Sequence, residues 1–139
     1  MAKTVRDIMT SNPVTLAANT PIVDAARAMR DNDIGVVVVE QNGQLFGLVT
    51  DRDIVVRAVA NNSNLSSTTL ESICSKDVTS LSPDQSDTDA VQLMRQKAIR
   101  RLPVVQNGKV VGIISLGDLA IEKDERSVLG QVSAAAGNQ

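Results

Sequence analysis

The sequence predicts a mixed α/β (α+β) fold made of two copies of one module, each a small β-sheet flanked by two helices. When the chain is aligned with itself at an offset of 65 residues, about a quarter of the positions from Val5 to Ile54 are identical. The apolar runs also follow the same order in both halves. Because repeated units that cannot close their own cores pack on each other, we expect the copies to be related by pseudo-twofold symmetry.

The repeat divides the chain into four segments. We expect the first copy at residues 1–60, a linker at 61–69, the second copy at 70–124 and a C-terminal tail at 125–139. The linker consists almost entirely of Asn, Ser and Thr, which favour loops over helices. Since about 60 residues bury only a modest part of their surface alone, the two copies are expected to fold together.

Each copy begins with a short helix, a short strand and a longer helix. Thr4 and Asp7 have the spacing of a capping box, and residues 14–16 form an apolar, β-branched run bounded by a proline. In the longer helix of the first copy, Thr20 is the expected N-cap and Pro21 the first helical residue. The predicted buried face is Ile22, Ala25, Ala26 and Met29, and the second copy, starting from Pro83 and Asp84, matches it with Ala90, Val91 and Met94.

Two apolar strands around an Asn-Gly dipeptide follow in each copy. Residues 36–40 and 45–49 flank Asn42-Gly43, and residues 104–105 and 110–114 flank Asn107-Gly108. Both residues of an Asn-Gly pair accept a positive φ angle, which is typical of a tight hairpin. Each hairpin leads directly into another helix, beginning at Thr50 or Ser115.

The composition restricts the chemistry. The chain has no histidine and one cysteine, Cys74, so it lacks the commonest general base and metal ligand and forms no internal disulfide. We therefore expect no enzyme and no protein-bound metal. A net charge of −2 and a single aromatic residue, Phe46, argue against nucleic-acid binding. Without an apolar run of about 18 residues or a signal-peptide pattern, a cytoplasmic protein with no membrane contact is expected.

The strongest chemical signal lies at the two strand-to-helix junctions. Thr50 and Asp53 follow one apolar strand, and Ser115 and Asp118 follow the other, each pair preceded by a glycine. A hydroxyl at a helix N-terminus suits a phosphate, a carboxylate three residues on can accept both hydroxyls of a ribose, and Arg52 can neutralise phosphate charge. The same residues also form capping boxes that need no ligand. The repetition of the motif at one spacing favours a binding site.

These motifs, in their order along the chain, resemble a cystathionine β-synthase (CBS) domain. They are an x-Val-Thr strand, an Asp-Ala-x-x-x-Met helix, a Leu-Pro-Val-Val strand, an Asn-Gly hairpin and a Gly-h-h-Thr/Ser-x-x-Asp junction, where h is apolar. Two such domains in tandem resemble a Bateman module, and the resemblance covers residues 5–121. The length and the ending at 122–130 also resemble small free-standing bacterial CBS-pair proteins, among them the hypoxic-response type, but metal and disulfide features known from some of these cannot carry over to this chain.

The resemblance implies a regulatory module that binds an adenosyl compound, such as AMP, ADP, ATP or S-adenosylmethionine, in clefts between the repeats. It assigns Asp53 and Asp118 to the ribose, and Thr50 and Ser115 to ribose or phosphate. The other implied ligand contacts are Thr15, Ile34, Gly35, Val36 and Arg52 in the first copy, and Thr79, Ile99, Arg100, Arg101 and Pro103 in the second. Mg²⁺ accompanying a bound nucleotide is the expected metal, and no catalytic cofactor is implied.

Without a catalytic domain, the output is expected to pass to an unidentified regulated protein or through a change of assembly. The helix at 54–59 carries Ile54, Val55, Val56 and Val59, and Leu119 and Ile121 repeat this apolar surface, so we predict a homodimer. The opposing interpretation is that all these residues face their own sheet. The alternative function is a ligand-free scaffold for protein interaction or oligomerisation.

Overall fold

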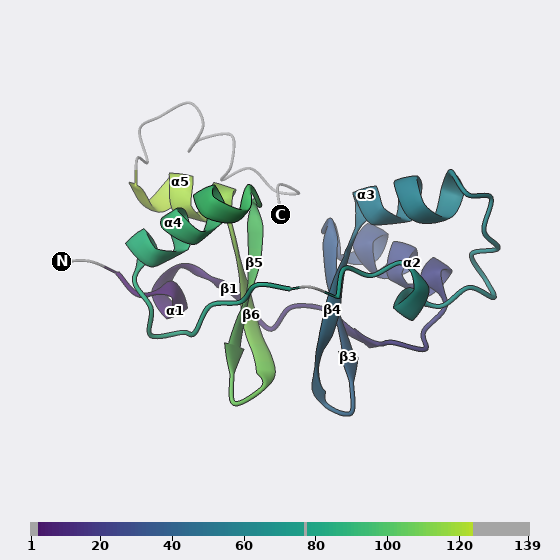
Figure 1. Cartoon of the computed structure of the whole chain (residues 1–139), viewed down its shortest axis with the longest axis horizontal. Coiled ribbons are helices and arrows are strands. Elements are labelled where there is room, and N and C mark those ends of the chain that lie inside the picture. Colours follow the sequence, from purple (N-terminus) through teal and green to yellow (C-terminus); the bar gives the residue numbers. More distant parts are fainter. Residues whose placement is uncertain (1–2, 77, 124–139) are drawn as a thin grey trace. The chain divides into compact units, whose positions relative to one another are not determined.

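The computed structural model describes residues 3–76 and 78–123. Contacts divide the chain into two compact units, Val14–Val78 and a second unit that combines the segment before Val14 with the segment from Thr79 onward. Each unit contains a three-stranded sheet, and its longer helices lie on one side of its hairpin (Figure 1). The predicted α/β fold with two copies of one module is therefore confirmed. Within the described ranges, no helix is long and apolar enough to cross a membrane.

The sheet of the Val14–Val78 unit has the strand order β2-β3-β4, with β2 parallel and β4 antiparallel to β3. Its strands are β2 (Thr15–Ala17), β3 (Val36–Gln41) and β4 (Gln44–Thr50), and its helices are α2 (Ile22–Asn32), α3 (Asp51–Asp53), the π-helix η1 (Ile54–Val59) and the 3₁₀-helix η2 (Leu70–Ser72). Val37 and Val39 enter the core together because alternate strand residues share a face, and Ala25 and Met29 of α2 meet them.

The other unit has the strand order β1-β6-β5, with both neighbouring pairs antiparallel. Its elements are α1 (Val5–Ile8), β1 (Thr10–Ser11), α4 (Asp87–Lys97), β5 (Arg101–Gln106), β6 (Lys109–Ser115) and α5 (Leu116–Lys123). The core of this unit contains Ala90 and Met94 of α4 together with Leu102, Val104 and Ile114 of the strands. The predicted buried faces of both long helices are thus confirmed at Ala25, Met29, Ala90 and Met94.

Both Asn-Gly hairpins form as predicted. The φ angles are 56° at Asn42 and 77° at Gly43, and 55° at Asn107 and 80° at Gly108. These positive values match the tight turns that fit the twist of a two-stranded ribbon. Each hairpin also has a register shift at the same place in the repeat, after Val39 in β3 and after Val104 in β5.

The opening segment of each copy packs in the unit that holds the strands of the other copy. Val5 of α1 is fully buried in the β5–β6 unit, where its N–H donates to the Gln85 carbonyl at 2.8 Å. Leu70 of η2 is fully buried in the β3–β4 unit, where its N–H donates to the Thr20 carbonyl at 2.9 Å. The boundaries of the two packing units therefore differ from those of the sequence repeat. The segments 1–60, 61–69, 70–124 and 125–139 remain a prediction, which concerns the repeat in the sequence and not the packing units.

The starts of the two long helices differ from the prediction. Pro21, not Thr20, is the N-cap of α2, which begins at Ile22. In the second copy the N-cap is Ser86, whose hydroxyl accepts from the Asp89 N–H at 3.1 Å. Residues 82–85 form a turn in which the Ser82 N–H donates to the Gln85 side chain at 2.8 Å. The helix therefore starts after Pro83 and Asp84. The helix expected to begin at Ser115 is described from Leu116 to Lys123, and residues 124–139, which include the expected tail, lie outside the described residues.

The first strand of the second copy is reduced to one bridge, between Leu81 and Val104, so the expected strand position of Thr79 is wrong. In the first copy, the Val38 N–H donates to the Val14 carbonyl at 2.9 Å. Pro103 occupies the position equivalent to Val38 at the 65-residue offset. Because proline has no backbone N–H, the equivalent hydrogen bond cannot form in the second copy.

Candidate functional site

The first candidate site residues meet where β4 passes into α3. Thr50, the last residue of β4, pairs across the sheet with Val36, the first residue of β3. The Asp51 N–H donates to the Gly35 carbonyl at 3.0 Å. These bonds hold the loop before β3 against the start of the helix. The structure therefore brings together Gly35, Val36, Thr50 and Asp53 as the resemblance implies.

The second copy repeats this arrangement where β6 passes into α5. Ser115 ends β6 and pairs with Arg101, the first residue of β5. The Leu116 N–H donates to the Arg100 carbonyl at 2.8 Å. Arg100, Arg101, Ser115 and Asp118 therefore form a second group of neighbours with the same backbone connections. We call the two groups, with the residues of each helix start, the Thr50 constellation (34–36 and 50–53) and the Ser115 constellation (99–101 and 115–118).

Both Thr/Ser-x-x-Asp motifs are capping boxes. In the first, the Thr50 N–H donates to Asp53 Oδ2 at 2.9 Å and the Asp53 N–H donates to the Thr50 hydroxyl at 3.1 Å. In the second, the Ser115 N–H donates to Asp118 Oδ2 at 2.9 Å and the Asp118 N–H donates to the Ser115 hydroxyl at 3.0 Å. The capping interpretation that the sequence left open is thus confirmed. The capping hydrogen bonds occupy one carboxylate oxygen of each aspartate and hold the other oxygen in a fixed position.

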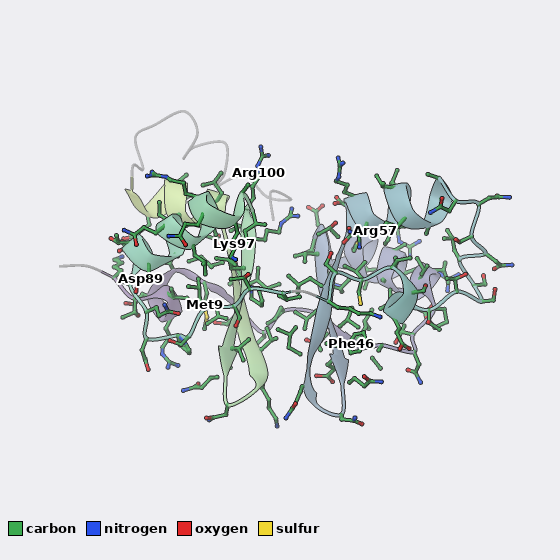
Figure 2. All side chains as sticks on the ribbon, in the orientation of Figure 1. Met9, Phe46, Arg57, Asp89, Lys97 and Arg100 are labelled. Carbon is green, nitrogen blue, oxygen red and sulfur yellow. The ribbon has the colours of Figure 1, made fainter. Side chains whose placement is uncertain are left out.

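Arg57 is a neighbour of Asp53 that the sequence reasoning missed. Arg57 stands on η1, in the helical segment that follows β4 (Figure 2). Its Nε lies 3.7 Å from Asp53 Oδ1, and one of its terminal N–H groups donates to the Ile73 carbonyl at 3.0 Å. The spacing of four residues between Asp53 and Arg57 on one helix was the signal that could have found it. Arg57 therefore links the candidate ribose carboxylate to the segment that follows η2.

The environment of Asp118 differs from that of Asp53. The position four residues on is Glu122, whose carboxylate pairs with Lys3 Nζ at 2.8 Å. Burial raises the pKa of Asp118, and its hydrogen bonds with Ser115 oppose this rise only in part. A charged Asp118 is therefore less favourable in the folded chain than an exposed aspartate.

Of the remaining predicted ligand contacts, Ile34, Ile99 and Arg52 belong to the constellations, whereas Thr15, Thr79 and Pro103 lie outside them. Ile34 packs against the core of its unit, and Ile99 packs against the core of the other unit. Thr15 on β2 pairs with Val38 of β3, and β3 separates it from β4, the strand that ends at Thr50. Pro103 is buried in β5 opposite Ile113, and Thr79 precedes the Leu81 bridge. Arg52 is exposed on α3.

Two small α/β repeats with a capped strand-to-helix junction in each define a tandem-repeat module. The CBS domain family model matches residues 5–59 and again residues 70–125, so the chain belongs to the CBS domain family. The chain is 40% identical over 119 residues to the CBS domain-containing protein YhcV of Bacillus subtilis, covering 86% of this chain and 84% of YhcV. Hypoxic response protein 1 of Mycobacterium tuberculosis is 27% identical over 132 residues, 94% of this chain and 92% of that protein.

Two solved structures extend this similarity. The CBS domain pair of protein MJ0100, in complex with 5′-methylthioadenosine and S-adenosyl-L-methionine, matches with a TM-score of 0.79 and 26% identity over 91% of this chain and 100% of that one. A hexameric CBS-CP12 protein from bloom-forming cyanobacteria matches with a TM-score of 0.80 and 28% identity over 89% of this chain and 70% of that one. The predicted resemblance to a CBS pair, including the hypoxic-response type, is confirmed.

Residues 3–76 and 78–123 contain no group of three or more His, Cys, Asp or Glu side chains placed to hold a metal ion. Cys74 is buried, and burial raises the pKa of its thiol. A thiol kept protonated and covered is a poor nucleophile and a poor metal ligand. Its position in a core cluster agrees with the small apolar role that its alignment with Met9 suggests.

Proposed function

We propose that this chain is a regulatory module that binds an adenosyl compound, either an adenine nucleotide (AMP, ADP or ATP) or S-adenosylmethionine. The observation that carries the proposal is the duplication of one geometry: a hydroxyl residue and an aspartate, locked together, at the end of a strand in each CBS repeat. A structural neighbour with 26% identity binds two adenosyl compounds, which supports the same ligand class for this chain. The role is regulatory rather than catalytic, in keeping with the family.

In this proposal, Asp53 and Asp118 accept hydrogen bonds from the ribose hydroxyls. Each uses Oδ2 for its own helix cap, so Oδ1 is the oxygen offered to the ligand. At Asp53, the nearest cation to this oxygen is Arg57, whose Nε lies 3.7 Å away. This distance is too long for a hydrogen bond, so Oδ1 can still accept one from a ribose hydroxyl. Thr50 and Ser115 lie beside the ribose or the phosphate, and Mg²⁺ accompanies a bound nucleotide.

The remaining predicted residues supply the base and phosphate contacts in this proposal. Backbone groups and apolar side chains at the start of β3 and of β5 contact adenine, and guanidinium groups contact phosphates. The base contacts are Thr15, Ile34, Gly35 and Val36 in one copy and Thr79, Ile99 and Pro103 in the other; the phosphate contacts are Arg52, Arg100 and Arg101.

The signal is proposed to leave through a partner protein or through the assembly state. Val55, Val56 and Val59 of η1 are 58%, 47% and 54% exposed, while Ile54 and Ala58 of the same helix are buried against the sheet. This exposed valine face adjoins Asp53 in sequence, and a structural neighbour is hexameric. We propose that a second copy of the chain covers the valine face. The same face also favours the second candidate function, an oligomerisation scaffold that needs no ligand.

A thermal-shift panel of adenosine, AMP, ADP, ATP and S-adenosylmethionine separates these functions. A ligand at a hundred times its dissociation constant stabilises the folded chain by about 2.7 kcal/mol, which raises the melting temperature by several degrees. Guanosine nucleotides serve as the control for non-specific phosphate effects. If no adenosyl compound shifts the melting temperature at millimolar concentration, the proposal is wrong and the scaffold function is favoured.

A further inference from the structure

Residues 73–75, which we call the crossing segment, lie along β4, the edge strand of the Val14–Val78 unit. The Ser75 N–H donates to the Leu48 carbonyl at 2.9 Å, and the Leu48 N–H donates to the Ser75 carbonyl at 3.2 Å. Shortly after this segment, at Thr79, the chain enters the other packing unit. The crossing segment is therefore the attachment to this sheet that precedes the passage of the chain into the other unit.

Arg57 of η1 joins the crossing segment to the Thr50 constellation (Figure 2). Its Nε lies 3.7 Å from Asp53 Oδ1. Its Nη1 donates to the Ile73 carbonyl at 3.0 Å and lies 3.5 Å from the Ser75 hydroxyl oxygen. Because the guanidinium group is planar and rigid, a displacement at one of these contacts moves the other. The candidate ribose carboxylate and the crossing segment are therefore connected through one side chain.

The other unit does not repeat this connection. Glu122 stands at the position that matches Arg57 in the repeat, and its carboxylate pairs with Lys3 Nζ at 2.8 Å. There, β1 (Thr10–Ser11) pairs with β6 through two residues, whereas the crossing segment pairs with β4 through the isolated bridge at Ser75. The attachment of the crossing segment therefore depends more on a side chain than the attachment of β1 does.

The attraction between Asp53 and Arg57 is sensitive to water. The two side chains are 14% and 49% exposed, and an ion pair at 3.7 Å that water reaches contributes little to stability. A ligand whose ribose covers Asp53 excludes water from this pair, which strengthens the attraction between the two charges. Arg57 is then held more firmly, and so is its hydrogen bond to the Ile73 carbonyl.

We propose that Arg57 is a positioning residue that couples adenosyl binding at Asp53 to the attachment of the crossing segment on β4. A bound ligand keeps the crossing segment closed on the sheet, and by thermodynamic reciprocity the attached segment strengthens ligand binding. Because this segment leads into the other packing unit, its attachment is the change by which the Thr50 constellation reports its occupancy. This inference rests on the proposed adenosyl binding and names the residue that transmits it.

The test is amide hydrogen exchange of the full chain, followed by NMR under native conditions with and without AMP. The reporter is the Ser75 N–H, which is released when the crossing segment opens. The reference is the Val38 N–H, which donates to the Val14 carbonyl at 2.9 Å within the sheet. Local opening exposes the reporter and leaves the reference protected. The two exchange rates therefore separate opening of the crossing segment from unfolding of the whole unit.

Two variants are compared with the wild type. Arg57→Gln removes the guanidinium group that contacts both Asp53 and the Ile73 carbonyl. Arg27→Gln is the matched control, because Arg27 is an exposed arginine of the same unit whose Nη1 also lies 3.7 Å from an aspartate oxygen, Oδ1 of Asp24. Both variants lose one positive charge and one ion pair, and only the first loses the contact with the crossing segment.

At ten times its dissociation constant, AMP should slow Ser75 exchange by about five- to tenfold in the wild type and in Arg27→Gln. In Arg57→Gln, Ser75 exchange should be faster without ligand and should change by less than about twofold with AMP. The Val38 N–H should still exchange more slowly with AMP in all three chains, because unfolding of the whole unit releases the ligand. A purely structural role of Arg57 would speed up Ser75 exchange and leave its response to AMP intact.

Calorimetry with adenosine, which has no phosphate, separates coupling from a direct contact between Arg57 and a phosphate group. Reciprocal coupling requires Arg57→Gln to weaken adenosine and AMP binding by similar factors, about two- to tenfold. A loss confined to AMP would indicate a phosphate contact and overturn the coupling. If bound AMP slows Ser75 exchange equally in Arg57→Gln, or not at all in the wild type, the coupling is wrong while adenosyl binding stands. If the wild-type chain binds neither compound, the proposed function fails and the coupling fails with it.

Discussion

The carbonyl group of Ser75 passes directly over Gly47, so that a Cβ atom built on Gly47 would lie 2.6 Å from the Ser75 oxygen. Gly112 has the same role in the other unit, where a Cβ would contact the Met9 sulfur and lie 2.9 Å from the Thr10 carbonyl oxygen. Side-chain carbons do not approach other atoms this closely. Glycine at these two positions therefore allows the opening segment of one copy to cross a strand of the other copy: the segment with Ser75 crosses β4 at Gly47, and the segment with Met9 and Thr10 crosses β6 at Gly112.

We predict that Gly47→Ala destabilises the chain by about 1 to 3 kcal/mol, because the obstacle is backbone and must move as a segment. Gly112→Ala should be partly relieved by Met9→Ala, since the nearest atoms there belong to a flexible side chain. Urea unfolding of the single and double variants measures both effects. A Gly47→Ala chain as stable as the wild type would show that the crossing segment is not held against β4.

Replacing the candidate ribose carboxylates should weaken adenosyl binding. We expect Asp53→Ala or Asp118→Ala to cost about 1.5 to 3 kcal/mol of affinity at its own site, the range for hydrogen bonds to a charged group. Asp51→Ala, which removes a carboxylate that caps neither helix, should cost much less with a weakly charged ligand such as adenosine. Calorimetry measures each affinity, and unchanged affinity in both Asp53→Ala and Asp118→Ala would end the assignment.

The half-buried carboxyl of Asp118 should change the pH dependence of the free energy of unfolding. Because burial raises its pKa in the folded chain, the folded state binds this proton more tightly than the unfolded state does. The stability gained from this proton is complete below the ordinary Asp pKa of about 3.9 and is lost as the pH rises through the folded pKa. The free energy of unfolding of the wild type, relative to Asp118→Asn, should therefore fall with rising pH over that interval. Denaturant titrations from acidic to neutral pH test this, and an opposite trend would contradict the burial of Asp118.

The valine face of η1 should hold two copies together. We expect light scattering at micromolar concentration to give about twice the chain mass of 14.7 kDa for the wild type, and a lower mass for Val56→Glu. Gln41→Glu, an equal addition of charge in the β3–β4 hairpin, serves as the control and should leave the mass unchanged. A monomer under every condition, with or without ATP and AMP, would remove the support for a homodimer.

Cys74 should resist alkylation in the folded chain. Its side chain is 7% exposed, and burial raises the pKa of its thiol, so the reactive thiolate is scarce and covered. Iodoacetamide should label it far more slowly in buffer than in concentrated urea at the same pH. Equal labelling rates would mean that the segment after η2 opens freely.

Features decided by neighbours in the sequence were the ones predicted correctly. The Asn-Gly hairpins follow from residues that tolerate positive φ, and the Thr50 and Ser115 caps follow from spacings of three residues. The N-caps Pro21 and Ser86 were missed by a few residues because competing turns and caps are each compatible with the same local sequence. These errors shift a boundary without changing the fold.

The amino-acid sequence by itself determined the duplication, the order of elements and the family, because all three are carried by residues at short, repeated spacings. Only the tertiary structure decided which segments meet across long distances in the chain. It brought Val5 and Leu70 into exchanged cores and Arg57 to the Ile73 carbonyl, and it exposed Val55 while burying Ile54. Such contacts depend on which surfaces are complementary when the whole chain is packed, and this complementarity cannot be predicted from the spacing of residues that are close in the sequence.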